Sequence, residues 1–241
     1  MIRRYFLPVL AAAALAGCPS APSQSVGYAG ANAPSPSGAL GGLIGDSASP
    51  EDAAVRDTLL KPTKVAFPTR VGMLFYGYTS ALKAEDQAAL LATVRSELVA
   101  TGLVKTALQI PQALVGGSPN LASLRKLAAR FQVDVLLLLS GQSGVQLSDA
   151  QPTSFFDSFG NKAWFEGRAS VDGLAVDVST GLFFTSFKAA GQNGPVQADR
   201  SVGFDASTYP LAKQAETAAL QGAKQRLVEA LTALKASEGA N

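Results

Sequence analysis

One short stretch, Val133 to Leu139, places the strongest constraint on how this 241-residue chain can fold. It reads Val-Asp-Val-Leu-Leu-Leu-Leu and is apolar at every position except Asp134. A strand with one face in water alternates between apolar and polar residues, whereas a continuous apolar run is typical of a central strand covered on both faces. The sequence therefore predicts a sheet with helices on both of its faces.

Two strands and a helix are predicted before this central strand. The strands are Arg70 to Tyr76 and Leu103 to Ile110, both rich in apolar residues. Between them, Leu82 to Thr101 has apolar residues at helical spacing, and Gly102 occupies the position of a C-cap. The apolar stripe of this helix consists of Leu91, Val94 and Leu98.

A second helix is predicted to begin near Ser118, which would be its N-cap, with Pro119 at the first helical position. Its apolar face consists of Leu121, Leu124, Ala128 and Phe131. The preceding Gly116-Gly117 pair could offer backbone N–H groups to an anion. It lacks the lysine of a P-loop and the spacing of a dinucleotide-binding loop, so a capped loop is the favoured interpretation.

The pattern after the central strand becomes antiparallel. Ala163 to Val178 and Leu182 to Ala189 predict a hairpin joined at Ser179–Gly181, with glycine where a turn needs positive φ. The alternation of the first arm changes phase near Gly173, which indicates a bulge. A final helix is predicted from Thr208 to Lys235. Its apolar face carries Leu220, Leu227, Leu231 and Leu234.

These elements predict a single α/β (α+β) domain of order βαβαββα, covering residues 51–241. Its mixed sheet has three parallel strands joined by right-handed crossovers, extended by the antiparallel hairpin and covered by helices. A short helix is expected at Glu51 to Leu60. Residues 19–50 are Pro, Ser, Gly or Ala at 24 of 32 positions, so the segment from Cys18 to Pro50 is predicted to be a disordered tether.

The chain contains no histidine, and Cys18 is its only cysteine. Intrachain disulfides, the common zinc sites and Ser-His or Cys-His nucleophiles are therefore excluded, and no cofactor or metal is expected. Removing residues 1–17 would leave 18 basic and 18 acidic residues, because the leader holds two of the 20 basic ones and no acidic one. A neutral chain lacks the positive field of a nucleic-acid-binding protein.

The first 17 residues have the character of an export signal. Arg3 and Arg4 precede an apolar stretch from Tyr5 to Ala16, which is too short to span a bilayer of about 30 Å. The stretch ends Leu15-Ala16-Gly17-Cys18, which resembles the lipobox of bacterial lipoproteins.

The lipobox resemblance implies cleavage between Gly17 and Cys18 and attachment of a diacylglyceryl group to the Cys18 thiol. The new amine would also be acylated, usually with palmitate, so that lipid chains hold the protein at a membrane. Pro19 and Ser20 follow the cysteine in place of aspartate. The sorting rules of lipoproteins then favour the outer membrane, with the domain facing the periplasm.

Short motifs in residues 50–205 resemble the rhombotarget lipoprotein family of bacteria. They are Pro68–Gly72, Leu90-Leu91, Ile110-Pro111, Gly116-Gly117, Phe131–Val135 and Val176–Gly181. The last two are also similar to the curli-secretion lipoprotein, the lipoprotein activators of penicillin-binding proteins and the N-terminal domain of the Tol translocation protein. This resemblance implies a mixed sheet with helices, used for binding or assembly instead of catalysis.

Four acidic residues are candidates for a catalytic carboxylate pair, namely Asp134, Asp172, Asp177 and Glu166. The sequence shows no pairing among them. Asp134 is expected to bond to nearby backbone and Asp177 to serve the hairpin turn, whereas Asp172 and Glu166 fall at strand positions expected to be solvated. We therefore expect no catalytic residues.

Aromatic residues are densest at Phe155, Phe156 and Phe159, followed by Trp164. An apolar patch in a connecting loop can mark a contact with a protein partner or a membrane. The alternative, that these rings pack into the core, is favoured because aromatic side chains are usually buried where partners exist.

The sequence predicts a non-enzymatic lipoprotein, anchored in the outer membrane by lipid, that binds or assembles with another cell-envelope protein. One alternative is a homo-oligomeric secretion or assembly component. The other is a hydrolase of cell-wall or glycan material that acts through carboxylates.

Overall fold

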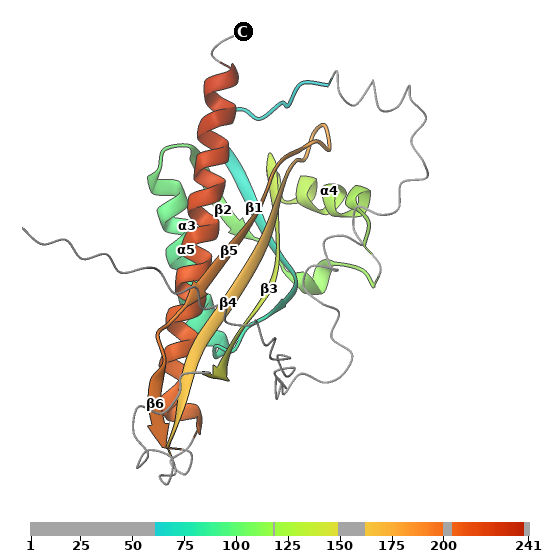
Figure 1. Cartoon of the computed structure of the whole chain (residues 1–241). Helices are drawn as coiled ribbons and strands as arrows, with labels where there is room; N and C mark the ends of the chain where they lie inside the picture. Colours follow the sequence, from blue (N-terminus) through green and yellow to red (C-terminus); the bar gives the residue numbers. More distant parts are fainter. Residues whose placement is uncertain (1–60, 118, 149–161, 200–203, 239–241) are drawn as a thin grey trace, which may run out of the picture. The chain divides into compact units, whose positions relative to one another are not determined.

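The computed structural model describes residues 61–117, 119–148, 162–199 and 204–238 (Figure 1). The predicted signal peptide, tether and short helix at Glu51–Leu60 lie outside these residues. In the described part, six strands form one mixed sheet. The strands are β1 (Thr69–Thr79), β2 (Val104–Gln109), β3 (Val135–Leu147), β4 (Lys162–Asp177), β5 (Phe183–Gln192) and β6 (Val196–Asp199).

The sheet order is β2-β1-β3-β4-β5, with β6 paired to β4. β1 runs parallel to both β2 and β3, whereas β4 is antiparallel to β3, β5 and β6. The predicted parallel start and antiparallel hairpin are therefore confirmed. The predicted order βαβαββα contains four strands, whereas the described chain runs βαβαββββα with six. The order counted the central strand and the two hairpin arms as two strands instead of three, and the pattern analysis missed β6, whose four residues are too few to show a period.

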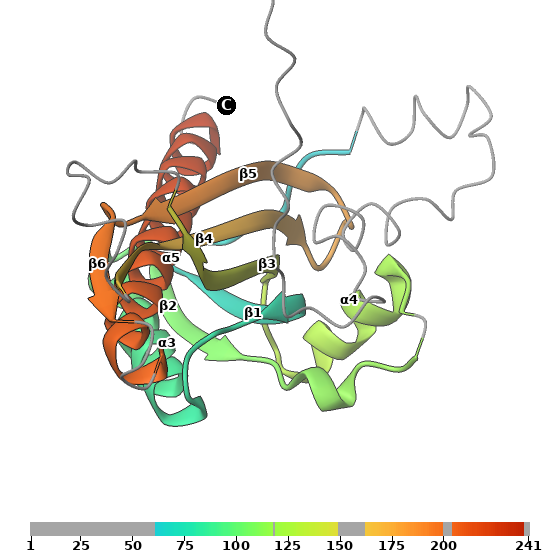
Figure 2. The same cartoon turned by 60° about the horizontal axis from the view of Figure 1, so that its bottom comes forward.

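Helices cover the two faces of the sheet unequally. α3 (Ala84–Ala100) and α5 (Phe204–Glu238) pack on one face, and α4 (Leu121–Arg130) packs on the other. Both views show α4 apart from the other two helices (Figures 1 and 2). A short 3₁₀ turn, Gln112–Leu114, connects β2 with the segment before α4.

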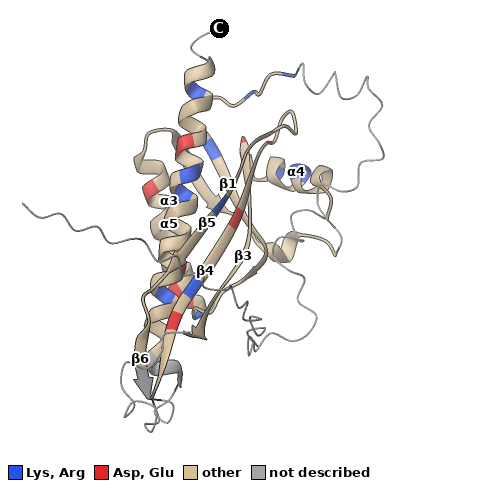
Figure 3. Cartoon of the chain, in the orientation of Figure 1, with Lys and Arg blue, Asp and Glu red and all other residues tan. Residues whose placement is uncertain are grey.

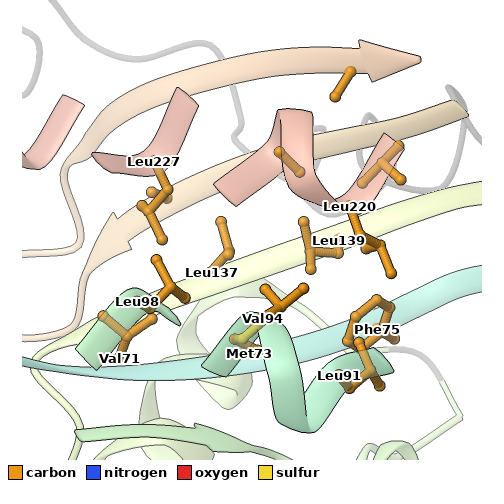
Figure 4. Close-up of a cluster of buried hydrophobic side chains, with 14 of the residues drawn as sticks. Val71, Met73, Phe75, Leu91, Val94, Leu98, Leu137, Leu139, Leu220 and Leu227 are labelled. Carbon is orange, nitrogen blue, oxygen red and sulfur yellow. The ribbon is translucent and has the colours of Figure 1, made fainter. Parts of the chain in front are cut away.

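Alternate residues of the central strands face the two helical layers, as the apolar run at Val133–Leu139 predicted. Val135, Leu137 and Leu139 belong to the core beneath α3 and α5, whereas Leu136 and Leu138 belong to the core beneath α4. Figure 4 shows how the larger core is filled from both helices. Its labelled residues are Val71, Met73, Phe75, Leu91, Val94, Leu98, Leu137, Leu139, Leu220 and Leu227. Each fully buried leucine contributes about 1.5–3 kcal/mol relative to exposure.

One local prediction, the cap of the second helix, is wrong. The N-cap of α4 is Asn120, because its side chain accepts the Ser123 N–H at 2.8 Å and Ser123 Oγ accepts the Asn120 N–H at 3.1 Å. The predicted cap, Ser118, lies outside the described residues. The irregularity predicted near Gly173 is present: the register between β4 and β5 shifts between Ala175 and Val176, although Gly173 itself stays in register with both neighbours. Leu174 and Val176 are also buried beneath α4 on the second face.

The turn of the β4–β5 hairpin follows the prediction. Gly181 has a φ of 79°, and its N–H donates to the Asp177 carbonyl at 2.8 Å. Close to this turn the first described segment enters the fold: the Lys64 N–H donates to the Asp177 carboxylate at 2.7 Å, and Val65 is buried in the larger core. The described domain therefore begins at the end of the sheet where β1 starts.

Candidate functional site

A buried carboxylate lies near the opposite end of the sheet. The side chain of Glu216, on α5, is fully buried. Ser80 Oγ donates to its two carboxylate oxygens at 2.9 and 2.8 Å, and Ser143 Oγ donates to one of them at 2.5 Å. We call Glu216, Ser80, Ser143 and the neighbouring Tyr78 the Glu216 cluster. Its hydroxyl groups compensate for taking the carboxyl group out of water.

Three elements distant in sequence form this cluster. Tyr78 lies in β1, Ser80 follows that strand, Ser143 lies in β3 and Glu216 comes from α5. Burial raises the pKa of Tyr78, and the negative charge of Glu216 raises it further. The Tyr78 hydroxyl is near that carboxylate but has no partner of good hydrogen-bond geometry in the described part of the chain. The phenol therefore stays protonated at physiological pH.

The sequence analysis missed the Glu216 cluster. A signal was present, because Glu216 interrupts a helical face of small and apolar residues. That face consists of Ala212, Ala215, Ala219, Leu220, Ala223 and Leu227, all of which are buried. An acid within an apolar stripe is rarely buried without a partner. The partners, however, lie on other elements and have no recognisable spacing from it.

A cleft of about 290 Å³ adjoins the Glu216 cluster. It lies beyond the carboxyl ends of the parallel strands β1 and β2, where open α/β sheets commonly bind ligands. The lining residues are Phe75, Tyr78, Ser80, Leu82, Ala84, Gln87, Gln109, Ile110 and Gln112. Phe75 and Tyr78 contact each other edge to face, with ring centroids 5.3 Å apart. All nine lining side chains are uncharged.

Two charged residues near the cleft, Lys83 and Asp86, are engaged with α5. The Lys83 ammonium lies 5.5 Å from the centre of the Tyr209 ring. Asp86 accepts hydrogen bonds from the Tyr209 hydroxyl and from Lys213 Nζ, the latter at 2.8 Å. These bonds, from Lys213 first and Tyr209 second, lower the pKa of Asp86. They tie the first turn of α3 to α5, and neither Lys83 nor Asp86 lines the cleft.

Two of the four predicted acidic candidates have structural roles at the other end of the sheet. Asp134 accepts the Arg70 N–H at 2.9 Å and pairs with the Arg70 guanidinium at 2.8 Å, so hydrogen bonds from Arg70 lower its pKa. The Asp177 carboxylate accepts from Ser179, Thr180 and the Lys64 N–H, as expected for a turn residue. Both predicted structural roles are confirmed.

The other two candidates differ from each other. Asp172 is half-buried on β4, opposite Ser140 and Lys188. Glu166 was predicted to be solvated, and this is wrong: it is only 5% exposed. It accepts a hydrogen bond from Gln146 Nε2 at 2.7 Å and pairs with Arg168 at 2.5 Å. Gln146 lies opposite Glu166 on β3, and Arg168 lies two residues further along β4. No group of three or more acidic, histidine or cysteine side chains able to hold a metal occurs among the described residues.

Asp177 should make stability depend on pH. Burial alone raises its pKa, but hydrogen bonds from Lys64, Thr180 and Ser179 outweigh burial and lower it. A carboxyl group with a lowered folded-state pKa stabilises the fold fully above its unfolded-state pKa of about 3.9, and this stabilisation disappears as the pH falls below it. Asp177→Asn should therefore lower the free energy of unfolding at pH 7 by about 1–3 kcal/mol and flatten its decline below pH 5. Urea unfolding between pH 3 and 7 measures both effects, and an unchanged slope would contradict the assignment.

The aromatic prediction is tested only in part, because Phe155, Phe156 and Phe159 lie outside the described residues. Phe165 is buried in a small cluster with Ala163 and Leu211. Trp164 is half-buried, and its indole nitrogen is buried without a hydrogen-bond partner in the described ranges. Gly17 and Cys18 also lie outside the structure's described part, so lipidation stays a prediction.

A larger, open groove of about 930 Å³ runs along α5 beside the end of α3. Its lining includes Glu97 and Thr101 of α3 and, on α5, Ala218, Gly222, Val228 and Ala233. Glu97 pairs with Lys224 at 2.7 Å across the two helices. Figure 3 shows both signs of charge along α3 and α5. Among the described residues, no helix has the length and apolar character needed to cross a bilayer.

Comparison with known proteins gives limited similarity. No protein-family model and no curated protein sequence matches the chain. Solved structures that match include a neuraminyllactose-binding hemagglutinin homolog from Helicobacter pylori, with 8% identity, a TM-score of 0.42, and coverage of 75% of this chain and 93% of that one. A minor lipoprotein from Acinetobacter baumannii matches with 12% identity, a TM-score of 0.36 and coverage of 71% and 96%.

Lipoprotein GNA1162 from Neisseria meningitidis also matches, with 18% identity, a TM-score of 0.31 and coverage of 52% of this chain and 83% of that one. At these identities and TM-scores, nothing about ligands, partners or activity follows for this chain. The resemblance to the rhombotarget family stays a prediction.

Proposed function

We propose that this chain is a non-enzymatic lipoprotein of the outer membrane whose periplasm-facing domain binds another cell-envelope protein. The Leu15–Cys18 pattern supports the anchor, and the Pro, Ser, Gly and Ala content of residues 19–50 supports a tether between lipid and domain. Membership of the rhombotarget family belongs to the same proposal.

The observation that carries the binding function is the open groove along α3 and α5. Its volume of about 930 Å³ is at the upper end of the range for ligand sites, and its lining comes from two helices that are fixed to the same sheet. Ala218, Gly222 and Ala233 lack bulky side chains, so the backbone of a partner segment can approach α5 closely. The groove therefore suits an extended or helical protein segment.

The state of the carboxylates supports a binding role over hydrolysis. Asp134, Asp177, Glu166 and Glu216 each accept hydrogen bonds or pair with a cation in the folded domain. General acid–base catalysis needs two carboxyl groups that face one substrate with separated pKa values. Within the described ranges, Asp134 and Asp177 lie at the same end of the sheet but are held by Arg70 and by the hairpin turn, whereas Glu166 lies on β4 and Glu216 on α5.

Photo-crosslinking in cells tests this proposal. A photoreactive amino acid at Ala218 or Ala233, both exposed in the groove, should form an adduct with one cell-envelope protein. The same group at Ser186, exposed on β5, should not. Cys18→Ala should abolish palmitate incorporation and greatly reduce the adduct, because it removes the atom that would carry the lipid.

Three outcomes would overturn the proposal. Adducts formed equally from Ser186 and Ala218 would remove the groove as the contact surface. An adduct made only with a second copy of the chain would favour the homo-oligomeric alternative. Turnover of cell-wall glycans by the purified chain, abolished by Asp134→Asn or Asp172→Asn, would favour the hydrolase.

A further inference from the structure

The 290 Å³ cleft beside the Glu216 cluster has a chemistry distinct from that of the α3–α5 groove. Three glutamine side chains reach it from separate elements: Gln87 from the first turn of α3, Gln109 from the end of β2, and Gln112 from the 3₁₀ turn. Their amide groups have no hydrogen-bond partner among the described residues. Each amide offers donors and an acceptor, so the cleft presents several unused hydrogen-bonding groups.

The uncharged lining of the cleft disfavours the binding of charged ligands. No lysine or arginine lines the cleft. Of the three charged residues adjacent in sequence to lining positions, Lys83 and Asp86 are engaged with Tyr209 on α5, whereas Glu85 is exposed. An anionic ligand would find no cation there and would approach the buried Glu216 carboxyl group. A cationic ligand would find no exposed carboxylate in the lining.

The volume, the aromatic wall and the location of the cleft limit further which ligands it can bind. The volume is just below the range of about 300–1,000 Å³ that holds drug-sized ligands, so one ring-sized unit fits and an extended chain does not. The edge-to-face pair of Phe75 and Tyr78 gives the cleft an apolar wall. The cleft lies at the end of β1, and the described domain begins at the start of β1, eleven residues or about 35 Å away.

We infer that this cleft binds one unit of an uncharged glycan. The three glutamine amides hydrogen-bond the hydroxyl or N-acetyl groups, and the apolar face of the sugar ring packs against the aromatic wall. Sugars combine many neutral hydrogen-bonding groups with an apolar ring face, which is the combination that this lining offers. The inference does not depend on a protein partner in the α3–α5 groove, and it places the glycan at the end of the sheet opposite the first described residues.

Calorimetric titration of the full chain in detergent tests the inference. The neutral probe is chitotetraose, the charged probe is tetragalacturonate, and an end-blocked tetra-alanine peptide represents an uncharged peptide. Chitotetraose should bind saturably, and at least about tenfold more tightly than either other probe. The double variant Gln109→Ala/Gln112→Ala should weaken this binding by about tenfold, because it removes two amides that each contribute about 0.5–1.5 kcal/mol.

Both glutamines are exposed, so their loss should not unfold the chain, and an unchanged thermal midpoint confirms this. Gln192→Ala, an exposed glutamine on β5, is the matched control and should bind like the unaltered chain. The inference is overturned by absence of saturable chitotetraose binding, by equal binding of the double variant, or by tighter binding of the peptide or the anionic probe. Groove variants that lose a protein adduct while chitotetraose binding persists would contradict only the proposed protein-binding function.

Discussion

Gly191→Ala should destabilise the domain by about 3 kcal/mol or more, because α5 crosses β5 at this residue without room for a side chain. A Cβ atom at Gly191 would lie 1.9 Å from the Ala215 carbonyl oxygen and 2.7 Å from the Ala219 nitrogen. Both contacts are with helix backbone, which cannot rotate away as a side chain can. Relief requires α5 to shift, and the buried Leu220 and Leu227 would shift with it.

Urea unfolding followed by circular dichroism measures this effect as a lower midpoint. Gly194→Ala is the matched control: it lies in the connection after β5, and a Cβ there would meet nothing within 4 Å. We expect the control to change the free energy of unfolding by less than about 0.5 kcal/mol. Equal effects of the two substitutions would show that α5 does not pack on β5 as described.

Glu216→Ala should cost about 3 kcal/mol, although it removes a buried acid from a core. The carboxyl group accepts from the hydroxyls of Ser80, which is shared between its two oxygens, and Ser143, and its loss leaves these two donors without an acceptor. Each buried donor left unsatisfied costs about 1–3 kcal/mol, and the shortened side chain leaves a cavity as well. The midpoint of urea unfolding should fall accordingly.

Two further variants test whether the effect of Glu216→Ala comes from the lost charge, the lost volume or the buried position of the residue. Glu216→Gln keeps the volume and one acceptor oxygen, so it should cost about half as much as Glu216→Ala. Glu229→Ala removes an acid from the exposed side of the same helix, where it contacts only the exposed side chains of Gln225 and Arg226 among the described residues, and should cost less than about 0.5 kcal/mol. A Glu216→Ala variant as stable as Glu229→Ala would refute a structural role for the cluster.

Element types could be predicted because they depend on local periodicity. The stripe Leu91, Val94 and Leu98 has helical spacing, and all three residues are buried on α3. Gly102, predicted to end that helix, has a φ of 72°. These features repeat within a few residues, so the sequence carries them without knowledge of the fold.

Predictions of burial failed at strand residues that are covered by side chains or helices from elsewhere in the fold. Glu166 occupies a strand position that alternation marks as solvated, yet it is buried against Gln146 and Arg168. Leu174, next to Gly173, is buried beneath α4, which the alternation of β4 alone did not indicate. Alternation along one strand cannot indicate which part of its second face a distant helix covers.

The sequence by itself determined the central strand, the hairpin, the three helices and the absence of histidine, and it carries the Leu15–Cys18 pattern on which the predicted anchor rests. Only the tertiary structure decided that Ser80, Ser143 and Glu216 meet, because 136 residues separate the first from the last. It also decided that Gln109 and Gln112 face a cleft free of charged side chains. Periodicity records whether a residue is buried, whereas a site depends on which buried and exposed groups the crossing of distant elements brings together.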